Sequence, residues 1–251
     1  MTVQDIDPIQ GTMPLLGHLG ELRRRLLISV AALAVASTVA WFSYDHAVAF
    51  MLGPYRSFLR HHANLNISKG QLVTTAPLEG FTTRLKVSVS MGAIAALPVW
   101  LWQVWRFITP GLYQTERRYA GRFLASALVL FGGGVATAIA VFPKGISWLI
   151  SVSGTGVAPL FSPSRYFGLY TLCCLVFGLA FIYPVVLVFL QLIGAVTSAR
   201  LRKWRRYAII LIVAAASVIT PSGDPFSFLA LAVPLVIFYE ASIIVGRLLN
   251  K

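Results

Sequence analysis

Charged residues are scarce in this chain, and acidic residues are the scarcest of them. Only 12% of the 251 residues are charged, against about 25% in an average soluble domain, and eight residues are Asp or Glu. Apolar residues make up 57% of the sequence, and the mean hydropathy is +0.78. One core cannot enclose so many apolar side chains in a chain of this length, so much of the surface must face a lipid bilayer. The composition excludes an ordinary soluble domain.

Side chains in catalytic arrangements are also missing. The four histidines all fall in predicted loops, and the sequence has no HExxH motif and no phosphate-binding loop of the Walker type. The two cysteines, Cys173 and Cys174, are adjacent in an apolar run and lack the spacing of a disulfide framework or a metal site. We therefore predict that the protein is not an enzyme and holds no metal or cofactor.

The net charge of +13 does not indicate a nucleic-acid partner, because the basic residues form short clusters between apolar runs, as they do beside membrane spans. Placing the N-terminus in the cytoplasm puts most of the 21 basic residues on the inner side, at 23–25, 106–122, 200–206 and 247–251. Basic residues are enriched on the cytoplasmic side of membrane proteins. Both termini are therefore predicted to be cytoplasmic.

Apolar runs long enough to cross a hydrocarbon core of about 30 Å divide the chain into predicted transmembrane helices. We predict one all-α integral membrane domain over residues 1–251, with six such helices. The second contains Pro98, which neighbouring helices make tolerable, and the third contains the cluster Gly132-Gly133-Gly134, which suits close helix packing. The predicted helices span about 26–44, 81–108, 119–142, 166–196, 207–220 and 226–245, with outer segments at 45–80 and 143–165.

The last two predicted helices are short. Tyr207–Thr220 would be only roughly 21 Å long, well below the thickness of a bilayer core. Pro234 and Glu240 shorten the apolar part of the sixth helix, and a tight turn at 221–225 joins the pair. We predict that the bilayer thins around this hairpin.

Two glutamates stand near the inner ends of predicted helices, and arginines follow each of them. Glu21 begins the run Glu-Leu-Arg-Arg-Arg, and Glu116 begins Glu-Arg-Arg. One interpretation is local charge balance in a solvated loop. The other is that the carboxylates receive a cationic partner from the cytoplasm, and the spacing alone leaves both interpretations open.

Three longer motifs resemble those of the TatC family. His-Leu-Gly-Glu-Leu-Arg-Arg-Arg-Leu at 18–26 resembles its HLxELRxRL signature at the first helix. Gln-Val-Trp-Arg-Phe-Ile-Thr-Pro-Gly-Leu-Tyr at 103–113, with Glu-Arg-Arg at 116–118, resembles its QVWxFxxPxLYxxERR loop. Residues 220–227, Pro234 and the Tyr-Glu pair at 239–240 resemble its fifth-to-sixth turn and last helix. The motifs occur in the family's order, and the resemblance covers residues 13–247.

The resemblance implies a function that spacing cannot supply. Proteins of this family are receptor and scaffold subunits of the twin-arginine translocase in the bacterial cytoplasmic (inner) membrane, where they bind twin-arginine signal peptides and export folded proteins using the proton-motive force. The implied partners are TatA- and TatB-type single-span subunits, docked on the fifth and sixth helices, and further copies of the chain within the complex.

The resemblance also implies a binding site. Glu21, Arg23, Phe107 and Glu116 would form it. A carboxylate can bind a guanidinium group through two parallel hydrogen bonds, which the ammonium group of lysine cannot form. The two glutamates would therefore bind the two arginines of the signal peptide. Arg23 would orient Glu21, and Phe107 would offer an apolar or cation–π surface. The supporting motif positions are His18, Leu22, Pro110, Leu112, Tyr113 and Arg117.

The free energy of peptide binding requires a second part to this site. An exposed ion pair contributes roughly 0.2–1 kcal/mol, whereas micromolar binding needs about 8 kcal/mol. The glutamates can select a peptide but cannot hold it alone. We therefore predict an apolar groove within the membrane for the apolar segment of the signal peptide.

Some family positions are open to structural interpretations here. Ile182 stands where many members carry a glutamate, so a role for that intramembrane acid does not transfer. Asp224 is as readily a turn cap, and Glu240 as readily a partner for Arg247 at the end of a helix. Further matching positions with a possible structural or partner role are Pro54 and Pro98.

The chief alternative function is a secondary transporter or channel for a small solute. Ion-coupled transport requires ionisable residues along a path through the membrane, and the third and fourth predicted helices are poor in them. The sequence also has no internal repeat of the kind found in inverted-repeat transporters.

Overall fold

The computed structural model describes residues 15–53, 72, 76–108, 120–152 and 161–248, and all regular structure within these ranges is helical. Five of these helices are long and apolar enough to cross a membrane, which confirms an all-α, membrane-spanning fold. Their candidate spans are Gly20–Phe42, Glu79–Phe107, Gly121–Val152, Pro163–Leu192 and Pro225–Leu248.

Eight helices are found in the described part of the chain. They are α1 (Leu15–Phe42), α2 (Tyr44–Met51), α4 (Glu79–Ile108), α6 (Ala120–Val152), α7 (Pro163–Leu192), α8 (Ser198–Lys203), α9 (Arg205–Ile219) and α10 (Pro225–Leu248). Helix α2 occupies the start of the predicted outer segment 45–80, and Pro54 in the same segment lies outside the described residues.

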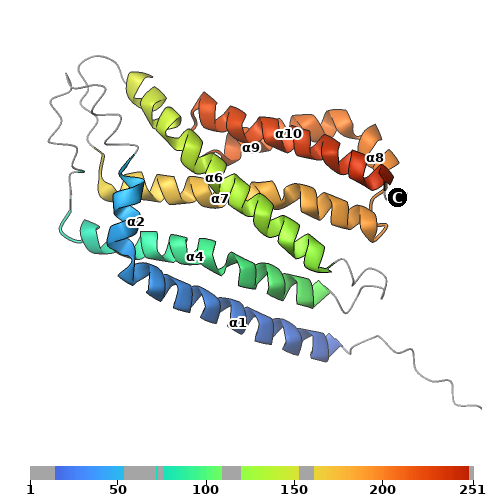
Figure 1. Ribbon diagram of the computed structural model, residues 1–251, viewed down its shortest axis with the longest axis horizontal. Coiled ribbons are helices and arrows are strands. Elements are labelled where there is room, and N and C mark those ends of the chain that lie inside the picture. Colours follow the sequence, from blue (N-terminus) through green and yellow to red (C-terminus); the bar gives the residue numbers. More distant parts are fainter. Residues whose placement is uncertain (1–14, 54–71, 73–75, 109–119, 153–160, 249–251) are drawn as a thin grey trace, which may run out of the picture.

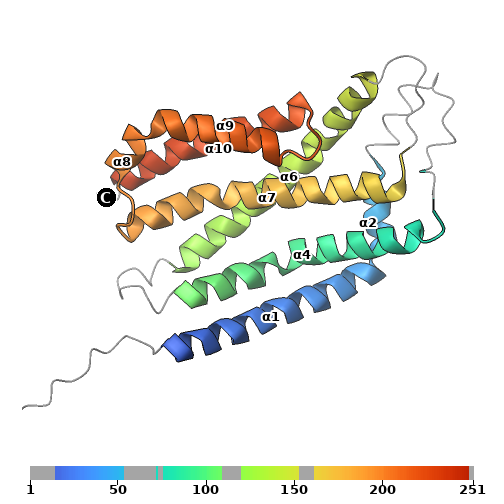
Figure 2. The same ribbon diagram turned by 180° about the vertical axis from the view of Figure 1, so that it is seen from behind.

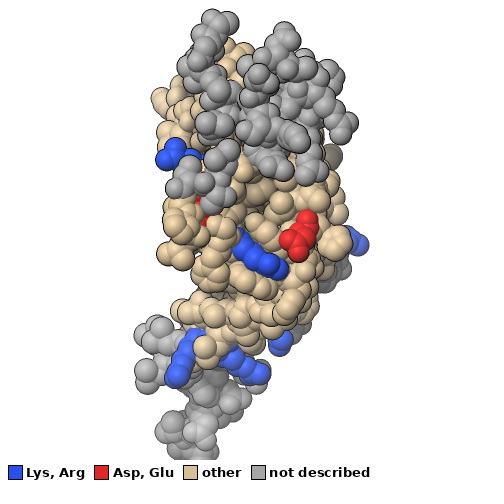
Figure 3. Space-filling model, turned by 90° about the vertical axis from the view of Figure 1, so that its left-hand side faces the viewer, with Lys and Arg blue, Asp and Glu red and all other residues tan. Residues whose placement is uncertain are grey.

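The long helices lie around α7, which packs against α4, α6 and α10 (Figures 1 and 2). Helix α1 forms one edge of the bundle through its contact with α4, and α9 forms the opposite edge through its contact with α10. The start of α1, the end of α7 and the end of α10 lie toward one end of the bundle (Figure 1). Figure 3 looks onto the other end, whose described surface is mostly uncharged.

Aromatic side chains fill the part of the core between α6 and α7. Phe142 meets Tyr170 with 4.6 Å and Tyr166 with 5.6 Å between ring centroids, both edge to face. The Tyr166 hydroxyl donates a hydrogen bond to the Met51 carbonyl oxygen at 2.9 Å. This bond fastens α2 to the start of α7.

One residue of the predicted glycine cluster brings helices close together. A Cβ atom at Gly134 would lie 2.4 Å from the carbonyl oxygen of Phe177, whereas Gly132 and Gly133 have no such neighbour within 4 Å. The α6 backbone therefore touches that of α7 at Gly134. The close-packing prediction is confirmed for this residue only.

The third predicted helix extends past its expected end at residue 142. Helix α6 continues through Pro143 to Val152, so Lys144 lies in a helix and not in an outer loop. Phe142 and Ile146 stand four residues apart on the same helical face, and both are buried. Their packing compensates for the backbone hydrogen bond that Pro143 cannot donate.

Two other boundaries also differ from the prediction. Helix α1 begins at Leu15 and not near 26, because the leucines and arginines of 15–25 favour a helix and outnumber its two glycines, and because Glu21 pairs with Arg25 at four-residue spacing. The backbone of His18 is therefore helical, and His46 lies in α2, so neither histidine is in a loop. Helix α7 ends at Leu192 and not at 196, because Gly194 has a φ of 73° that the helix cannot continue through.

Helix α9 and the tight turn after it match their predictions, whereas α10 does not. It was predicted to be short, but it has 24 residues, continues through Pro234 and is long and apolar enough to cross a membrane. Helix α9 has 15 residues and carries exposed apolar side chains such as Leu211 and Val218. Asp224 precedes α10 and is fully buried, and its Oδ1 accepts a hydrogen bond from the Ser227 amide at 2.7 Å. The Ser222 hydroxyl donates to its Oδ2. Asp224 therefore caps α10, as the structural interpretation predicts.

Candidate functional site

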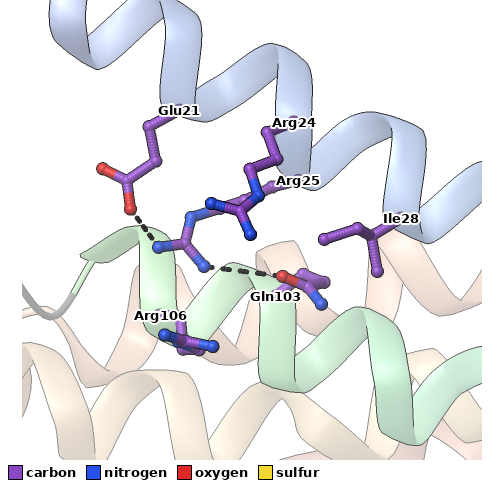
Figure 4. Close-up of a pocket in the computed structure, with 6 residues that line it drawn as sticks. All are labelled: Glu21, Arg24, Arg25, Ile28, Gln103 and Arg106. Carbon is purple, nitrogen blue, oxygen red and sulfur yellow. Dashed lines mark hydrogen bonds and ion pairs between the residues drawn. The ribbon is translucent and has the colours of Figure 1, made fainter.

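Helices α1 and α4 enclose a small polar pocket at the end of the bundle where α1 begins. On α1, Glu21, Arg24, Arg25 and Ile28 follow the spacing i, i+3, i+4 and i+7, which places them on one helical face. Gln103 and Arg106 lie one turn apart on the facing side of α4 (Figure 4). The six side chains line a cavity of about 140 Å³.

Arg25 lies at the centre of this pocket and links the two helices. Its Nη2 donates to the Oε1 atom of Glu21, and its Nη1 donates to the Oε1 atom of Gln103 at 3.4 Å (Figure 4). The side chains of Arg25 and Glu21 are only 14% and 21% exposed. Because the pair is shielded from water, it is held more firmly than an ion pair on an open surface.

The second carboxylate oxygen of Glu21 is available to a ligand as a hydrogen-bond acceptor. Glu21 Oε2 is buried and has no hydrogen-bond partner among the described residues. A buried carboxylate oxygen without a partner carries a desolvation cost that a bound donor removes. The pocket holds three arginines and one glutamate, so a cationic ligand would need a further anionic group beside Glu21.

The predicted site residues are only partly described. Glu21 lines the pocket, whereas Arg23 and Leu22 are exposed. Phe107 is half-buried and directly follows Arg106, which lines the pocket. The expectation that Arg23 orients Glu21 is wrong, because Arg25 makes that contact one turn further along α1. The side chain of His18 and the residues Pro110, Leu112, Tyr113, Glu116 and Arg117 lie outside the described part.

Sequence reasoning missed five of the residues that line the pocket. Four of them are polar or charged, and the signal that could have found them is helical periodicity carried back from the apolar span into 15–25. The predicted start at residue 26 placed Glu21 in a loop and so concealed its helical neighbours. The missed residues are Arg24, Arg25, Ile28, Gln103 and Arg106.

An apolar groove lies on the other side of α4 from the polar pocket. It has a volume of about 370 Å³ and is formed between α4, α6 and α7. Trp105, Phe123 and Phe189 meet there with ring centroids 5.2–5.8 Å apart. Ile182 lines the groove, and the side chains around it are apolar as well.

Glu240 has a different partner from the one predicted. Its Oε2 accepts a hydrogen bond from Arg205 Nη2 at 2.6 Å, and the pair is partly exposed. Arg205 begins α9, so this ion pair joins α9 to α10. The interpretation of Glu240 as a partner for Arg247, one of the two that the sequence left open, is therefore wrong.

The fold and the pocket define a class: a polytopic helical membrane protein with a shielded, charged recess at one end of its bundle. The sequence profile of the family described as "Sec-independent protein translocase protein (TatC)" matches residues 17–234. The chain belongs to the TatC family and is a component of the twin-arginine protein translocase.

Individual relatives agree with this assignment. The TatC protein of Frankia casuarinae is 37% identical over 243 residues, which covers 95% of this chain and 67% of that protein. The TatC protein of Koribacter versatilis is 35% identical, with 95% and 86% covered. The crystal structure of a twin-arginine translocase receptor, TatC, is similar to this chain, with a TM-score of 0.75 and 32% identity over 93% of this chain and all of that one.

Proposed function

We propose that this chain is the signal-peptide receptor of its translocase and that Glu21 binds an arginine of the peptide. The observation that carries the proposal is the Glu21 carboxylate, which is shielded in the pocket and only half engaged by Arg25. The unpaired Oε2 atom is the acceptor for an incoming guanidinium group. Arg25 keeps Oε1, so the carboxylate would bridge two arginines.

A second anionic group is needed in this proposal, and Glu116 supplies it. Glu116 follows the end of α4 by eight residues, a stretch that reaches at most about 29 Å when extended. This is ample to bring its carboxylate to the pocket that α4 lines. Phe107, in the last turn of α4, would give the peptide an apolar surface, and exposed Arg23 would contact the peptide backbone or its acidic residues.

The apolar groove between α4, α6 and α7 would hold the apolar segment of the peptide. Leu101 and Val104 line this groove, and Gln103 on the same turn of α4 lines the polar pocket. A peptide that crosses the end of α4 could therefore engage both. Apolar burial contributes about 25 cal/mol per Å², so a few hundred Å² in the groove would supply most of the binding free energy.

The same proposal includes a topology. It has six spans, with the short α9 as the fifth, and both termini on the side of the membrane that carries the polar pocket. Arg106 and the basic residues of 200–206 and 247 support the assignment of that side to the cytoplasmic face of the bacterial inner membrane, because basic residues are enriched there. Signal peptides arrive from the cytoplasm, so this is the side on which the receptor pocket must open.

TatA- and TatB-type single-span subunits would complete the complex, together with further copies of this chain. Helix α9 supports a docking role, because its edge position leaves Leu211 70% and Val218 84% exposed. An apolar helix from a partner would cover this face. Six helices cannot enclose a passage for a folded protein, so recruited subunits would form it, driven by the proton-motive force.

The test is photo-crosslinking of a twin-arginine signal peptide to residues 21 and 116 in the assembled complex. The double variant Glu21→Gln, Glu116→Gln should lose binding of the arginine peptide and its preference over a twin-lysine peptide. Glu240→Gln is the control, because it removes a carboxylate of α10 that does not line the pocket. Equal binding by the double amide variant would refute the assigned site.

A further inference from the structure

A second polar cleft lies at the same end of the bundle, between α8 and the last turn of α10. It has a volume of about 450 Å³ and is lined by Ser198, Ala199, Arg202, Lys203 and Arg247. Helix α8 packs against α10 (Figure 2), so cations that are more than forty positions apart in sequence face one cleft. No residue that lines it is acidic.

The nearby acid does not neutralise these cations. Glu240 is the acidic residue of α10, and its carboxylate already forms an ion pair with Arg205. Arg202, Lys203 and Arg247 form no ion pair within the described part of the chain. Like charges that line one cleft repel each other, and an anionic ligand removes that cost.

Aromatic residues place the cleft at the level of the lipid headgroups. Trp204 follows Lys203 directly and Tyr207 stands three residues further on. The two side chains are 60% and 73% exposed, with ring centroids 6.4 Å apart. Exposed Trp and Tyr side chains at helix ends occupy the boundary between hydrocarbon and water. The candidate membrane span of α10 also ends beside the cleft, at Leu248.

We propose that this cleft binds the phosphate group of an anionic phospholipid. Arginine forks and a lysine ammonium match the oxygens of a phosphate group. A basic pocket between membrane helices is a recognised type of headgroup site. The general excess of basic residues on one side of a membrane protein needs no cleft, so topology alone does not account for their gathering here.

The bound lipid would hold α8 against α10 at the membrane surface. This inference does not depend on peptide recognition by Glu21, because the two sites share no residue. Failure of either proposal leaves the other intact.

The experiment compares lipids that stay bound to the purified protein in detergent, counted by native mass spectrometry. The wild-type protein should retain phosphatidylglycerol in preference to zwitterionic phosphatidylcholine, and high salt should abolish the preference. The triple variant Arg202→Gln, Lys203→Gln, Arg247→Gln should bind phosphatidylglycerol at least tenfold more weakly, since each cation near an anionic lipid is worth about fivefold.

A matched variant removes the same charge from the opposite end of the bundle. Lys86→Gln, Lys144→Gln, Arg165→Gln should keep the lipid preference, because these exposed residues lie at the start of α4, the end of α6 and the start of α7. Equal losses in both variants, or no loss in the first, would overturn the proposal. Because the salt response is measured on the wild-type protein, it tests the proposal even if a variant fails to fold.

A competition arm separates a lipid from free phosphate. Inorganic phosphate in large excess should leave phosphatidylglycerol bound, because the acyl chains contribute to its binding. Displacement of the lipid by inorganic phosphate would show that the cleft binds soluble anions, and would overturn the lipid assignment.

Discussion

Arg25 holds one oxygen of the Glu21 carboxylate and leaves the other without a partner among the described residues. The protein thus places one of its own arginines beside the carboxylate that is proposed to receive an arginine from a peptide. Gln103 keeps Arg25 in this position from the neighbouring helix. Arg25 is therefore both a support for Glu21 and a competitor for it.

Replacing Arg25 should strengthen peptide binding. In Arg25→Gln the Glu21 carboxylate loses its internal cation, so we expect a twin-arginine peptide to bind about fivefold more tightly, from an ion-pair energy of about 1 kcal/mol. Arg24→Gln is the matched control, because Arg24 lines the pocket without a hydrogen bond to Glu21. Peptide titration by fluorescence anisotropy measures both. Weaker binding by Arg25→Gln than by Arg24→Gln would show that support outweighs competition.

The sequence was sufficient for the class of fold and insufficient for the pocket. Apolar runs predict the long helices because burial in lipid dominates their energetics, and Pro98 interrupts neither the pattern nor α4. The pocket depends on a helix that extends below the apolar span and on a bond between Arg25 and Gln103, which stand 78 positions apart. Pairings of this kind are fixed by how α1 and α4 pack, which no local pattern reports. The same holds for Glu240, whose partner Arg205 belongs to another helix.

Gly134 should tolerate no side chain. In Gly134→Ala the new Cβ would stand 2.4 Å from a backbone carbonyl oxygen of α7, so α6 must move away, and we expect a loss of roughly 1–3 kcal/mol in the free energy of unfolding. Gly133→Ala meets nothing within 4 Å and should be as stable as the wild type or slightly more so. Thermal unfolding in detergent compares them. Equal midpoints for the two variants would contradict the close approach of α6 and α7.

Asp224 should act through its hydrogen bonds. Asp224→Ala removes the acceptor of the Ser227 amide, so we expect a loss of about 1–2 kcal/mol in unfolding free energy, with a smaller loss in Asp224→Asn, which keeps an acceptor. Thermal unfolding of both variants gives the difference. Export assays add a second measurement: a stable Asp224→Asn protein that fails to export its cargo would show that the charge has a role beyond capping.

The pair of Arg205 and Glu240 should show a small coupling energy. Both side chains are partly exposed, at 47% and 34%, so a double-mutant cycle with Arg205→Gln and Glu240→Gln should give about 0.2–1 kcal/mol. The equivalent cycle with Arg247→Gln and Glu240→Gln should give none. A coupling found only in the second cycle would restore the partner that the sequence suggests.

Helix α9 should thin the bilayer around it. Its 15 residues span about 22 Å, whereas a hydrocarbon core is about 30 Å thick, and its outer apolar face has no protein cover within the described residues. This mismatch in length costs the least free energy if the bilayer thins around the helix. A spin label at Val218, near the end of α9, should then be reached by a water-soluble relaxation agent. A label at Val129, which is 74% exposed within the long helix α6, should be protected from the agent.

The length of the lipid chains gives a second measurement. Lipids with shorter chains should raise the thermal stability of the protein, and one added apolar turn in α9 should shift the chain length of greatest stability toward thicker bilayers. Equal protection of the two labels would mean that the membrane keeps its full thickness beside α9.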